Sequence, residues 1–537
     1  MNKSLFSVLL LGAFISTHVF ALECDLWEDR QRISHIKAAD DLASTYCFGY
    51  LHGRDRAWQL DYFRRTAYGR NAEAYGFSHL KSDLMMRLLD LPQWAEKLWA
   101  GLNERERVWL ITYAEGVNHG LKESRKRPTK EFQDGYPIVE KWRPQHSLAV
   151  LLLQSFDQTR KTFYTEWEEA MAEEMWSKRT LDLFTADGLP WDTSVLKAGE
   201  YPLGTYPSTV QVPPSTTPAP KLWAKFPTPF GEETGSNNWV VSGAHSRSGR
   251  AIFANAPHLD LKTPPLRSWV HVDTPEMDVV GASLPGIPLV VSGTNRKVSW
   301  GLTNAYINTA DLVRLNEADE DKLESYRPTV WVKFGPFKPP FFFKSFKKTA
   351  QGYPMIPLET KDPRAMVLKW TGFHLKGGDV GSLRDLMKST SAEDTEKVLA
   401  GVGIPAWNFV FADVNGHIGH RVVGKALRST TVSPIGPQVE TLEQMGRPAM
   451  LSPEEMPHVL NPSRGWIATG NNRQWPADAA FFGGRSYSNG FRAFRIEELL
   501  AQTAKHDRES FLKVQCDTQV VDARYLAPLL ADEACHR

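Results

Sequence analysis

A proline-rich stretch separates two unlike parts of this chain and limits what either part can form. Eight prolines fall between Pro202 and Pro229, mixed with serine, threonine and alanine. Proline lacks an amide donor and disfavours helix, so this stretch is predicted to be an extended, exposed linker. Before it, residues from about 40 to 198 are predicted to be mainly helical, because apolar residues recur at helical spacing, for example from Leu110 to Val117.

The part after Gly235 changes to short runs that are typical of β-strands, with glycine, asparagine and proline between them. The runs that we expect to be strands are 238–242, 251–255, 289–292 and 298–302, followed by a hairpin of 407–412 and 418–423. Helix is predicted to return at 495–502 and at 508–514. A helical block, a linker and a β-rich block with late helices together predict an α+β fold.

Residues 1–21 have the form of a secretory signal. Lys3 gives a positive start, Leu5–Ile15 is apolar except for a serine and a glycine, and Val19-Phe20-Ala21 offers a cleavage site. The apolar run is about half of the ~20 residues that a membrane-spanning helix needs, so an N-terminal anchor is the weaker alternative. We expect the mature chain to be exported to the periplasm or outside the cell, with no membrane partner after signal removal.

Four cysteines fit an exported chain, because two disulfides can form outside the cytoplasm. They cluster at the two ends of the sequence, at Cys24 and Cys47 and then at Cys516 and Cys535. Three pairings are open, of which we favour pairing within each end.

Composition and motif searches exclude several kinds of function. The 63 Lys and Arg residues balance 62 Asp and Glu residues, which is not the charge of a nucleic-acid-binding protein. No phosphate-binding loop, dinucleotide fingerprint or Gly-x-Ser-x-Gly elbow is found. His417 and His420 lie three residues apart in the predicted hairpin, so they should point to opposite faces and suit one metal ion poorly.

One short motif carries chemistry and follows directly behind the linker: Thr234-Gly235-Ser236-Asn237-Asn238-Trp239. By itself it is typical of a polar turn that opens a strand. Cleavage before Ser236, however, would break no domain and would give that serine a free α-amino group, whose pKa is ordinarily about 7.7–8.0. A serine hydroxyl needs a base beside it to act as a nucleophile. Scission at Gly235–Ser236 supplies both groups in one residue.

Further motifs occur in a fixed order along nearly the whole chain. They are residues 48–59, 64–65, 69–70, 72–73, 113–118, 235–239, 255–259, 281–288, 300–304, 408–413 with Gly416, 469–472 and 515–517. With these motifs the chain resembles the penicillin acylase family of N-terminal nucleophile hydrolases, which includes penicillin, cephalosporin and acyl-homoserine lactone acylases.

The resemblance implies a role for five residues. Ser236 would be the nucleophile, with its own α-amine as general base through a water molecule. Asn408 would donate its side-chain amide to the oxyanion, and Asn304 its backbone N–H. His258 would orient the amine, and Arg428 would steady the asparagine and the amine. Three of them have a plain alternative: Asn408 could be a buried asparagine that only satisfies the backbone, His258 a loop histidine and Arg428 a surface arginine.

The resemblance also implies an αββα N-terminal nucleophile hydrolase sandwich with a mainly helical N-terminal region. The expected divisions are a signal peptide at 1–21, a helical α-subunit region at 22–200, a spacer at 201–235 and a β-subunit region at 236–537. The precursor would thus give an α/β heterodimer. No organic cofactor is expected. Many family members hold structural calcium, for which Asp311 is the candidate ligand here, although Asn308 and Ala310 stand where another acid would be needed.

The expected substrates are small N-acyl amides with a hydrophobic acyl group, either β-lactam side chains or acyl-homoserine lactones. Relative to the family, the chain is expected to be short at its C-terminus, which would leave sheet edges unpaired. The main alternative is therefore a truncated, non-catalytic relative that acts as a binding or partner protein. A conventional Ser-His-Asp hydrolase, which needs no new N-terminus, is the third interpretation.

Overall fold

The structure is a computed structural model that describes residues 24–175, 192–200, 225–229, 235–342, 345–357, 366–428, 438–476 and 487–535. The expected signal at 1–21 and most of the expected spacer at 201–235 lie outside the described residues. Within the described part, every helix is too short or too polar to cross a membrane.

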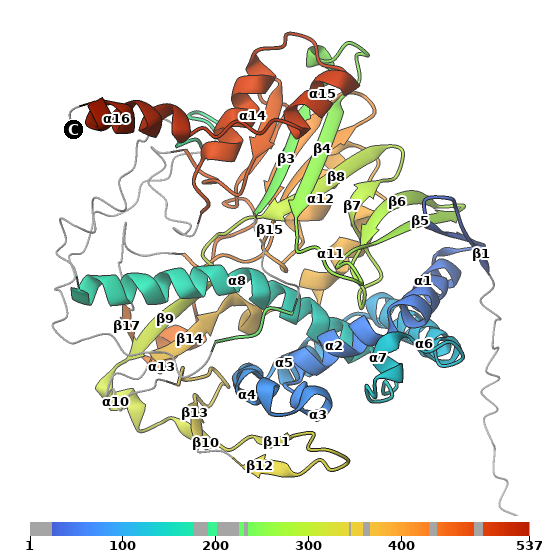
Figure 1. The fold of residues 1–537 in the computed structure, drawn as a ribbon, viewed down its shortest axis with the longest axis vertical. Helices are drawn as coiled ribbons and strands as arrows, with labels where there is room; N and C mark the ends of the chain where they lie inside the picture. Colours follow the sequence, from blue (N-terminus) through green and yellow to red (C-terminus); the bar gives the residue numbers. More distant parts are fainter. Residues whose placement is uncertain are drawn as a thin grey trace, which may run out of the picture.

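Helices make up most of the first part of the chain, as the apolar periodicity predicts (Figure 1). They are α1 (Asp41–Asp55), α2 (Ala57–Ala67), α3 (Ala72–Tyr75), η1 (Gly76–His79), α4 (Leu80–Leu89), α5 (Leu91–Gly101), α6 (Glu104–Ser124), α7 (Lys130–Gln133) and the long α8 (Pro144–Met175). The later helices are α10 (Glu317–Glu320), η2 (Gly243–His245), η3 (Thr371–His374), α11 (Gly378–Leu386), α12 (Ala392–Ala400), α13 (Leu442–Gly446), α14 (Phe491–Ala501), α15 (Arg508–Gln515) and α16 (Ala523–Cys535).

Helices α1 and α6 pack with their backbones in contact. A Cβ atom added at Gly116 would lie 1.9 Å from the carbonyl oxygen of Tyr46, and Gly49, Gly53 and Gly120 are similarly close to the facing helix. Each helix therefore carries two glycines one turn apart on the contact face. This contact explains why two of the sequence motifs, 48–59 and 113–118, contain glycine inside a helix.

In the described residues, strands form two main sheets and three small ones. The nine-stranded sheet has the order β1 (Cys24–Glu28), β2 (Ser34–Ala38), β5 (Ser268–Thr274), β6 (Met277–Ser283), β7 (Val290–Thr294), β8 (Val298–Asn304), β15 (Trp407–Asp413), β16 (Ile418–Val422) and β18 (His458–Leu460). The three-stranded sheet has the order β19 (Trp466–Thr469), β3 (Gly235–Val241) and β4 (Ile252–His258). The small sheets are β14 (Met366–Trp370), β9 (Ala310–Leu315) and β17 (Gln438–Glu440); β10 (Glu324–Tyr326) with β13 (Phe346–Lys348); and β11 (Thr329–Trp331) with β12 (Pro340–Phe342).

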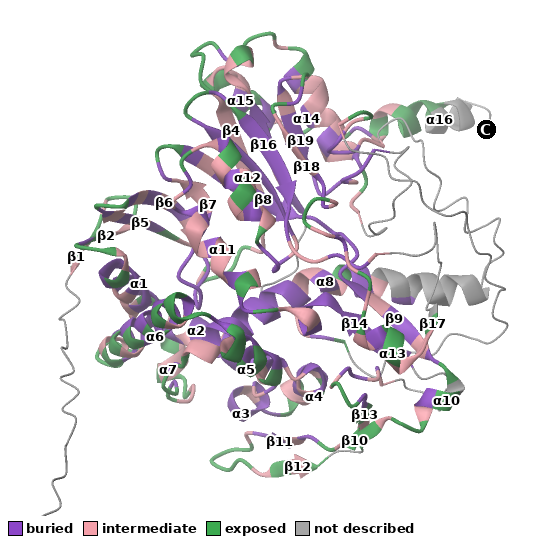
Figure 2. Cartoon of the chain, turned by 180° about the vertical axis from the view of Figure 1, so that it is seen from behind, coloured by how far each residue is buried: buried purple, intermediate pink, exposed green. Residues whose placement is uncertain are grey.

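The two main sheets face each other between two layers of helix. Successive residues of β3 point to opposite faces. Val240 packs with Val410 and Ile418 of the nine-stranded sheet, whereas Trp239 packs with apolar residues of α14 and α15, such as Phe511. Helix α12 contacts β15 and β16 on the other side of the nine-stranded sheet, as the view from behind shows (Figure 2). The expected αββα sandwich is therefore confirmed.

The disulfide expectation is half right. Cys24 of β1 is bonded to Cys47 of α1, which ties the first strand to the helical part. Cys516 is an exposed free thiol, so the expected pairing of the two C-terminal cysteines is wrong. It follows α15 on the surface, and position in the sequence alone did not reveal that exposure.

Candidate active site

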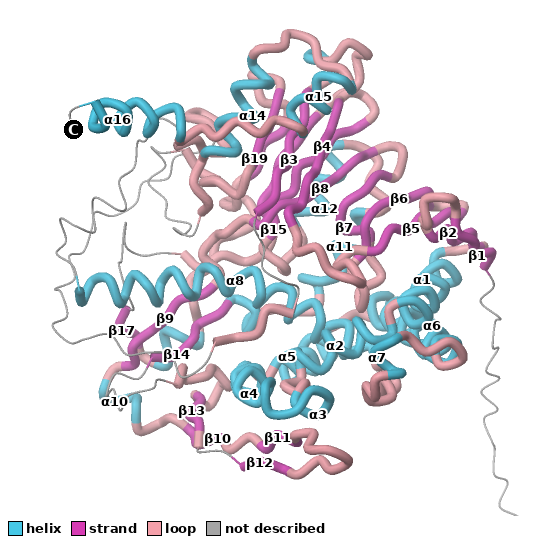
Figure 3. Tube along the Cα trace, in the orientation of Figure 1, coloured by secondary structure: helices cyan, strands magenta, loops and turns pink. Residues whose placement is uncertain are grey.

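Ser236 lies in the middle strand of the three-stranded sheet, where Figure 3 shows β3 between β19 and β4. It stands opposite Pro257 of β4, and it is only 3% exposed. β4 pairs with β3 along its whole length, whereas β19 pairs with it only from Asn238 to Val241, so β4 is the strand that positions Ser236. The segment after β19 and the start of α14 then bring polar side chains to it.

Asn471 and Arg492 hold the backbone of Ser236. The N–H of Ser236 donates to Asn471 Oδ1 at 2.7 Å, and Arg492 Nη1 donates to the carbonyl oxygen of Ser236 at 2.7 Å. Arg492 also donates to Asn237 Oδ1 at 2.6 Å and to Asn471 Oδ1 at 2.9 Å. Asn471 is fully buried and has a φ of 64°, a conformation that asparagine adopts more readily than most residues.

The peptide bond before Ser236 has a geometry that favours glycine. Gly235 has a φ of 142°, and a Cβ atom there would lie 2.6 Å from Arg492 Nη2. The Oγ of Ser236 donates to the carbonyl oxygen of Gly235 at 2.8 Å. The hydroxyl therefore lies next to the carbonyl group of the bond that sequence reasoning expects to be cut.

Asn304 ends β8, and its backbone faces Asn471. The next residue, Ala305, donates its N–H to the carbonyl oxygen of Ala406 beside β15. Hydrogen-bonded and non-hydrogen-bonded pairs alternate in an antiparallel ladder, so the N–H and C=O of Asn304 point away from β15. The carbonyl accepts from Asn471 Nδ2 at 3.0 Å. The N–H of Asn304 thus lies on the side of Asn471, and Asn304 lines the same small cavity as Ser236.

Asn408 is completely buried in β15, but its side chain is engaged elsewhere. Its Nδ2 donates to Thr469 Oγ1 and to Gln474 Oε1, both at 3.0 Å. Gln474 Nε2 itself donates to two backbone carbonyl oxygens, so the orientation of both amides is fixed. Both amide hydrogens of Asn408 are occupied in this arrangement, whereas the resemblance implies that the amide donates to an oxyanion.

His258 ends β4 and stands opposite Gly235 across the β3–β4 pair. The pKa of His258 is lowered, first by partial burial and second by the positive charge of Arg492. The imidazole is therefore neutral at neutral pH, so it can accept a proton or a hydrogen bond. The structure brings His258 to the same end of β3 as Ser236.

The arginine at this site is Arg492, not the expected Arg428. Arg428 follows the hairpin strand β16 and forms an ion pair with Glu455. Sequence reasoning missed Arg492 because α14 crosses the three-stranded sheet, a contact that no spacing along the chain shows. Asn471 was also missed, although it belongs to the 469–472 motif, where a buried asparagine beside glycine was the available signal.

A cavity of about 30 Å³ adjoins Ser236, which is space for about one water molecule. Its polar lining comes from Gln154, Asp157 and Gln158 of α8 and from Ser236, Arg267 and Asn304, and its apolar lining comes from Pro257, Leu259, Leu266 and Leu302. The Oε1 atoms of Gln154 and Gln158 are buried and have no hydrogen-bond partner in the described part of the chain. The cavity therefore presents hydrogen-bond acceptors close to Ser236.

The surroundings of Asp311 do not fit calcium. Asn308 Nδ2 donates to Asp311 Oδ1 at 2.8 Å, and Lys369 Nζ lies 3.3 Å from Asp311 Oδ2. Lys369 also pairs with Glu440 at 2.6 Å, so the two carboxylates share one buried ammonium group. Calcium needs six to eight oxygen ligands, and here a cation already occupies the centre of the group. The expected calcium ligand is thus part of an ion-pair cluster.

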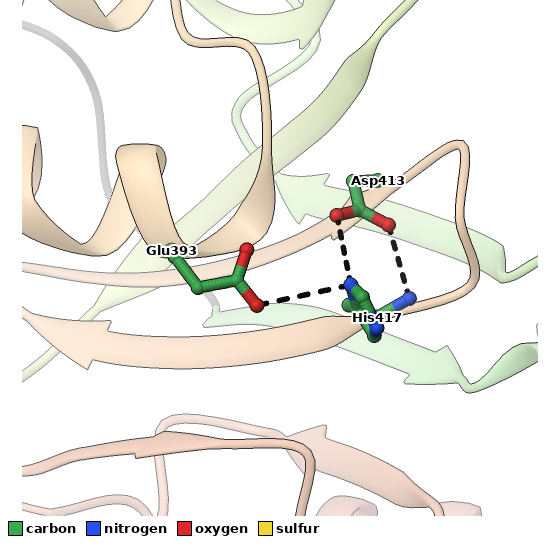
Figure 4. Close-up of side chains that lie close together, drawn as sticks. All are labelled: Glu393, Asp413 and His417. Carbon is green, nitrogen blue, oxygen red and sulfur yellow. Dashed lines mark hydrogen bonds and ion pairs between the residues drawn. The ribbon is translucent and has the colours of Figure 1, made fainter.

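A second group of side chains has the composition of a metal site (Figure 4). The ligand atoms of Glu393, Asp413 and His417 lie within 4.8 Å of one another. Asp413 is buried, however, and its oxygens accept from the backbone N–H groups of Ala392, Asn415 and His417. These bonds anchor the β15–β16 turn to the start of α12, so the described geometry is that of a structural cap.

Comparisons with known proteins point in one direction. The sequence model of a family described as penicillin amidase matches residues 25–537. An acyl-homoserine lactone acylase, QuiP, of Pseudomonas fluorescens is 26% identical over 88% of this chain and 58% of its own length. The penicillin acylase 2 proenzyme of a Pseudomonas species is 25% identical over 90% of this chain and 63% of its own length.

One further relative and one solved structure are similar at lower sequence identity. Penicillin G acylase of Escherichia coli is 23% identical over 95% of this chain and 66% of its own length. A solved structure of a thermostable penicillin G acylase from Alcaligenes faecalis is 18% identical, covers 56% of both chains and gives a TM-score of 0.48. The chain thus spans about three-fifths of the length of the curated relatives that it matches.

Proposed function

The chain belongs to the penicillin amidase family, and from that premise we propose that it is an N-terminal serine amidohydrolase, cut at Gly235–Ser236, that cleaves N-acyl amides. The observation that carries the proposal is the set of contacts around Ser236. A buried serine hydroxyl lies 2.8 Å from the preceding carbonyl oxygen, and its backbone nitrogen is already held by Asn471.

Cleavage before Ser236 would turn that nitrogen into an α-amine without moving it. Asn471 Oδ1, now 2.7 Å away, would accept a hydrogen bond from the amine. The guanidinium group of Arg492 lies against the same asparagine, and a nearby positive charge disfavours a second one. We propose that Asn471 orients the amine and that Arg492 keeps it neutral, so that it acts as the general base.

The same geometry suggests how the cut is made. In a self-cleavage, Ser236 Oγ attacks the carbonyl carbon of Gly235, and the C–N bond to Ser236 breaks as an ester forms. Water then hydrolyses this ester, which restores the hydroxyl and leaves the free amine. A left-handed glycine backbone at Gly235 and the adjacent hydroxyl support this step.

Amide hydrolysis would repeat the chemistry on a substrate. The amine takes the proton of Ser236 Oγ while the oxygen attacks the substrate carbonyl, and the proton then passes to the departing amine. Water attacks the acyl-serine ester and releases the acid. We propose the backbone N–H of Asn304 as one donor to the oxyanion. Asn408 can serve as the second donor only by releasing Thr469 or Gln474, which it holds now.

We propose that the acyl group enters beside α8. The cavity there holds about 30 Å³ in the continuous chain, too little for an acyl group, so scission must open it. Gln154, Asp157 and Gln158 make this side more polar than a purely hydrophobic acyl group would need. Small acyl groups with a hydrogen-bonding substituent, in amides of the β-lactam or homoserine lactone type, are the proposed substrates, in the periplasm or outside the cell.

Intact-mass measurement of the purified full-length protein tests the proposal. The expected result is two chains, one of which begins at Ser236, with amidase activity on N-acyl substrates. Ser236→Ala should stay in one piece and be inactive, whereas Ser242→Ala, just past the far end of the same strand, should cut and hydrolyse normally. An uncut wild-type chain that still hydrolyses amides would refute the N-terminal serine mechanism. An uncut chain without activity would instead favour a binding or partner role.

A further inference from the structure

Two histidines on neighbouring strands face each other through their ring nitrogens. His35 of β2 and His271 of β5 are register partners in a parallel pair. Their Nδ1 atoms lie 2.9 Å apart, and the rings are nearly perpendicular, with an interplanar angle of 88°. Trp27 of β1 stacks on the His35 ring, with centroids 4.9 Å apart. Packing therefore holds both rings in place.

A carboxylate lies at the far nitrogen of each ring. Asp29 Oδ2 is 3.3 Å from His35 Nε2, and Asp278 Oδ1 is 2.9 Å from His271 Nε2. An ionised carboxylate only accepts hydrogen bonds, so each Nε2 is placed to carry the hydrogen. A neutral imidazole has one hydrogen, and each Nδ1 is then left with a lone pair. Two lone pairs that face each other at 2.9 Å need a positive charge between them.

We propose that His35 and His271 bind a first-row transition cation, Cu²⁺ or Zn²⁺, through their Nδ1 atoms. Metal-binding histidines almost always donate their other N–H to a carboxylate or a carbonyl group, and both rings have that arrangement here. Metal–nitrogen distances of about 2.0–2.1 Å at a tetrahedral angle place the two nitrogens about 3.3 Å apart. The rings need to separate by only a few tenths of an ångström, and water can complete the coordination.

Access and charge favour a cation at this point. The side chains of His35 and His271 are 19% and 18% exposed, so an ion can reach them from solvent. Asp29 and Asp278 bring two negative charges, of which Arg296 balances one through its ion pair with Asp278. Two strands, β6 and β7, separate β5 from β8, so the pair is well apart from Asn304 and the proposal is independent of the amidase activity.

The Glu393–Asp413–His417 group provides an internal control. It also contains a histidine and two carboxylates, but Asp413 is occupied by backbone N–H groups. If mere proximity of such side chains were enough, this group should bind the same metals. The two groups can therefore be compared within one protein.

The test uses chelator-treated full-length protein without an affinity tag, in a Cys516→Ser background that removes the exposed thiol. Titration with Cu²⁺ and with Zn²⁺ is followed by calorimetry, and the Cu²⁺ complex by electron paramagnetic resonance. We expect one tight site, bound more strongly by Cu²⁺ than by Zn²⁺, with hyperfine coupling to two nitrogens. His35→Ala and His271→Ala should each weaken binding at least tenfold, and Asp278→Asn about 10- to 100-fold.

Three results would overturn the proposal. One is Cu²⁺ binding that is unchanged in both histidine variants. Another is binding that is lost in His417→Ala instead, which should leave the tight site intact. The third is no metal bound at 100-fold excess over protein, in which case the two rings share a proton only. The wild-type spectrum decides the number of nitrogen ligands even if a histidine variant fails to fold.

Discussion

Replacing Arg492 by lysine should slow both scission and amide hydrolysis while leaving the fold intact. The guanidinium group donates to the carbonyl oxygen of Ser236, to Asn237 Oδ1 and to Asn471 Oδ1. A lysine ammonium keeps the positive charge but is a point donor without the planar fork, so it cannot reach all three oxygens at once. In the Arg492→Lys variant, the ammonium group is thus expected to hold one oxygen and to release the others.

The magnitude follows from these bonds. Hydrogen bonds that involve a charged group contribute about 1.5–3 kcal/mol each. The contacts to Ser236 and Asn237 share one nitrogen of Arg492, so they count as about one bond, and Asn471 keeps its bond from Ser236. The variant should therefore lose about the stabilisation of the reacting site that one strong hydrogen bond gives, about 2–3 kcal/mol. At about 1.36 kcal/mol per factor of ten, this is a decrease of about 30- to 160-fold in either rate.

The assay follows the appearance of the chain that begins at Ser236 by mass spectrometry, and kcat/KM on an N-acyl amide for the processed fraction. Arg495→Lys is the matched control, since Arg495 lies one turn further along α14 and pairs with Asp517 and Glu498. The control should process and hydrolyse within about twofold of wild type. If Arg492→Lys does the same, or if both variants are equally slow, Arg492 has no specific role at Ser236.

Other predictions concern stability and ions. Gly116→Ala should lower the Tm measured by thermal denaturation, because the added methyl group must separate α1 from α6. This separation costs about 1–3 kcal/mol and exceeds the gain of about 1 kcal/mol in helix propensity. Gly446→Ala, where the methyl group meets open space, should leave the Tm unchanged. Ca²⁺ added to chelator-treated protein should leave the Tm unchanged because Asp311 is already paired with Lys369, and a Tm that rises with Ca²⁺ would contradict this. Burial lowers the pKa of His420 to about 3, so below pH 6.5 the unfolded chain takes up a proton that the folded chain does not. The free energy of unfolding should therefore decrease as the pH is lowered. His420→Leu should reduce this loss between pH 6.5 and 5 by about 2 kcal/mol, as measured by urea denaturation.

Local pattern was enough for the elements that carry Ser236. The short β-like runs 238–242 and 407–412 predicted β3 and β15, and the helical spacing of apolar residues from Leu110 to Val117 predicted α6. These features depend on residues near one another in sequence. The αββα layers came from the resemblance and were confirmed by the packing on the two faces of β3.

Contacts between distant segments could not be predicted in this way. Arg492 reaches Ser236 from a helix 256 residues away, and no spacing rule distinguishes it from Arg428. Lys369 comes to Asp311 from β14, which converts an expected calcium ligand into half of an ion pair. The amide of Asn408 is directed by Thr469 and Gln474, which follow Asn408 by 61 and 66 residues. In each case, tertiary packing decided which polar group met which.

The middle position of β3 has a consequence for how a catalyst could be made here. Freshly cut polypeptide ends usually fray, because their first residues lose half of their neighbours. Ser236 pairs with β4 on one side, and Asn471 and Arg492 hold its nitrogen and its carbonyl oxygen. Cleavage before Ser236 would release the preceding segment and leave the serine in its present position. The active site would then form without a rearrangement of β3.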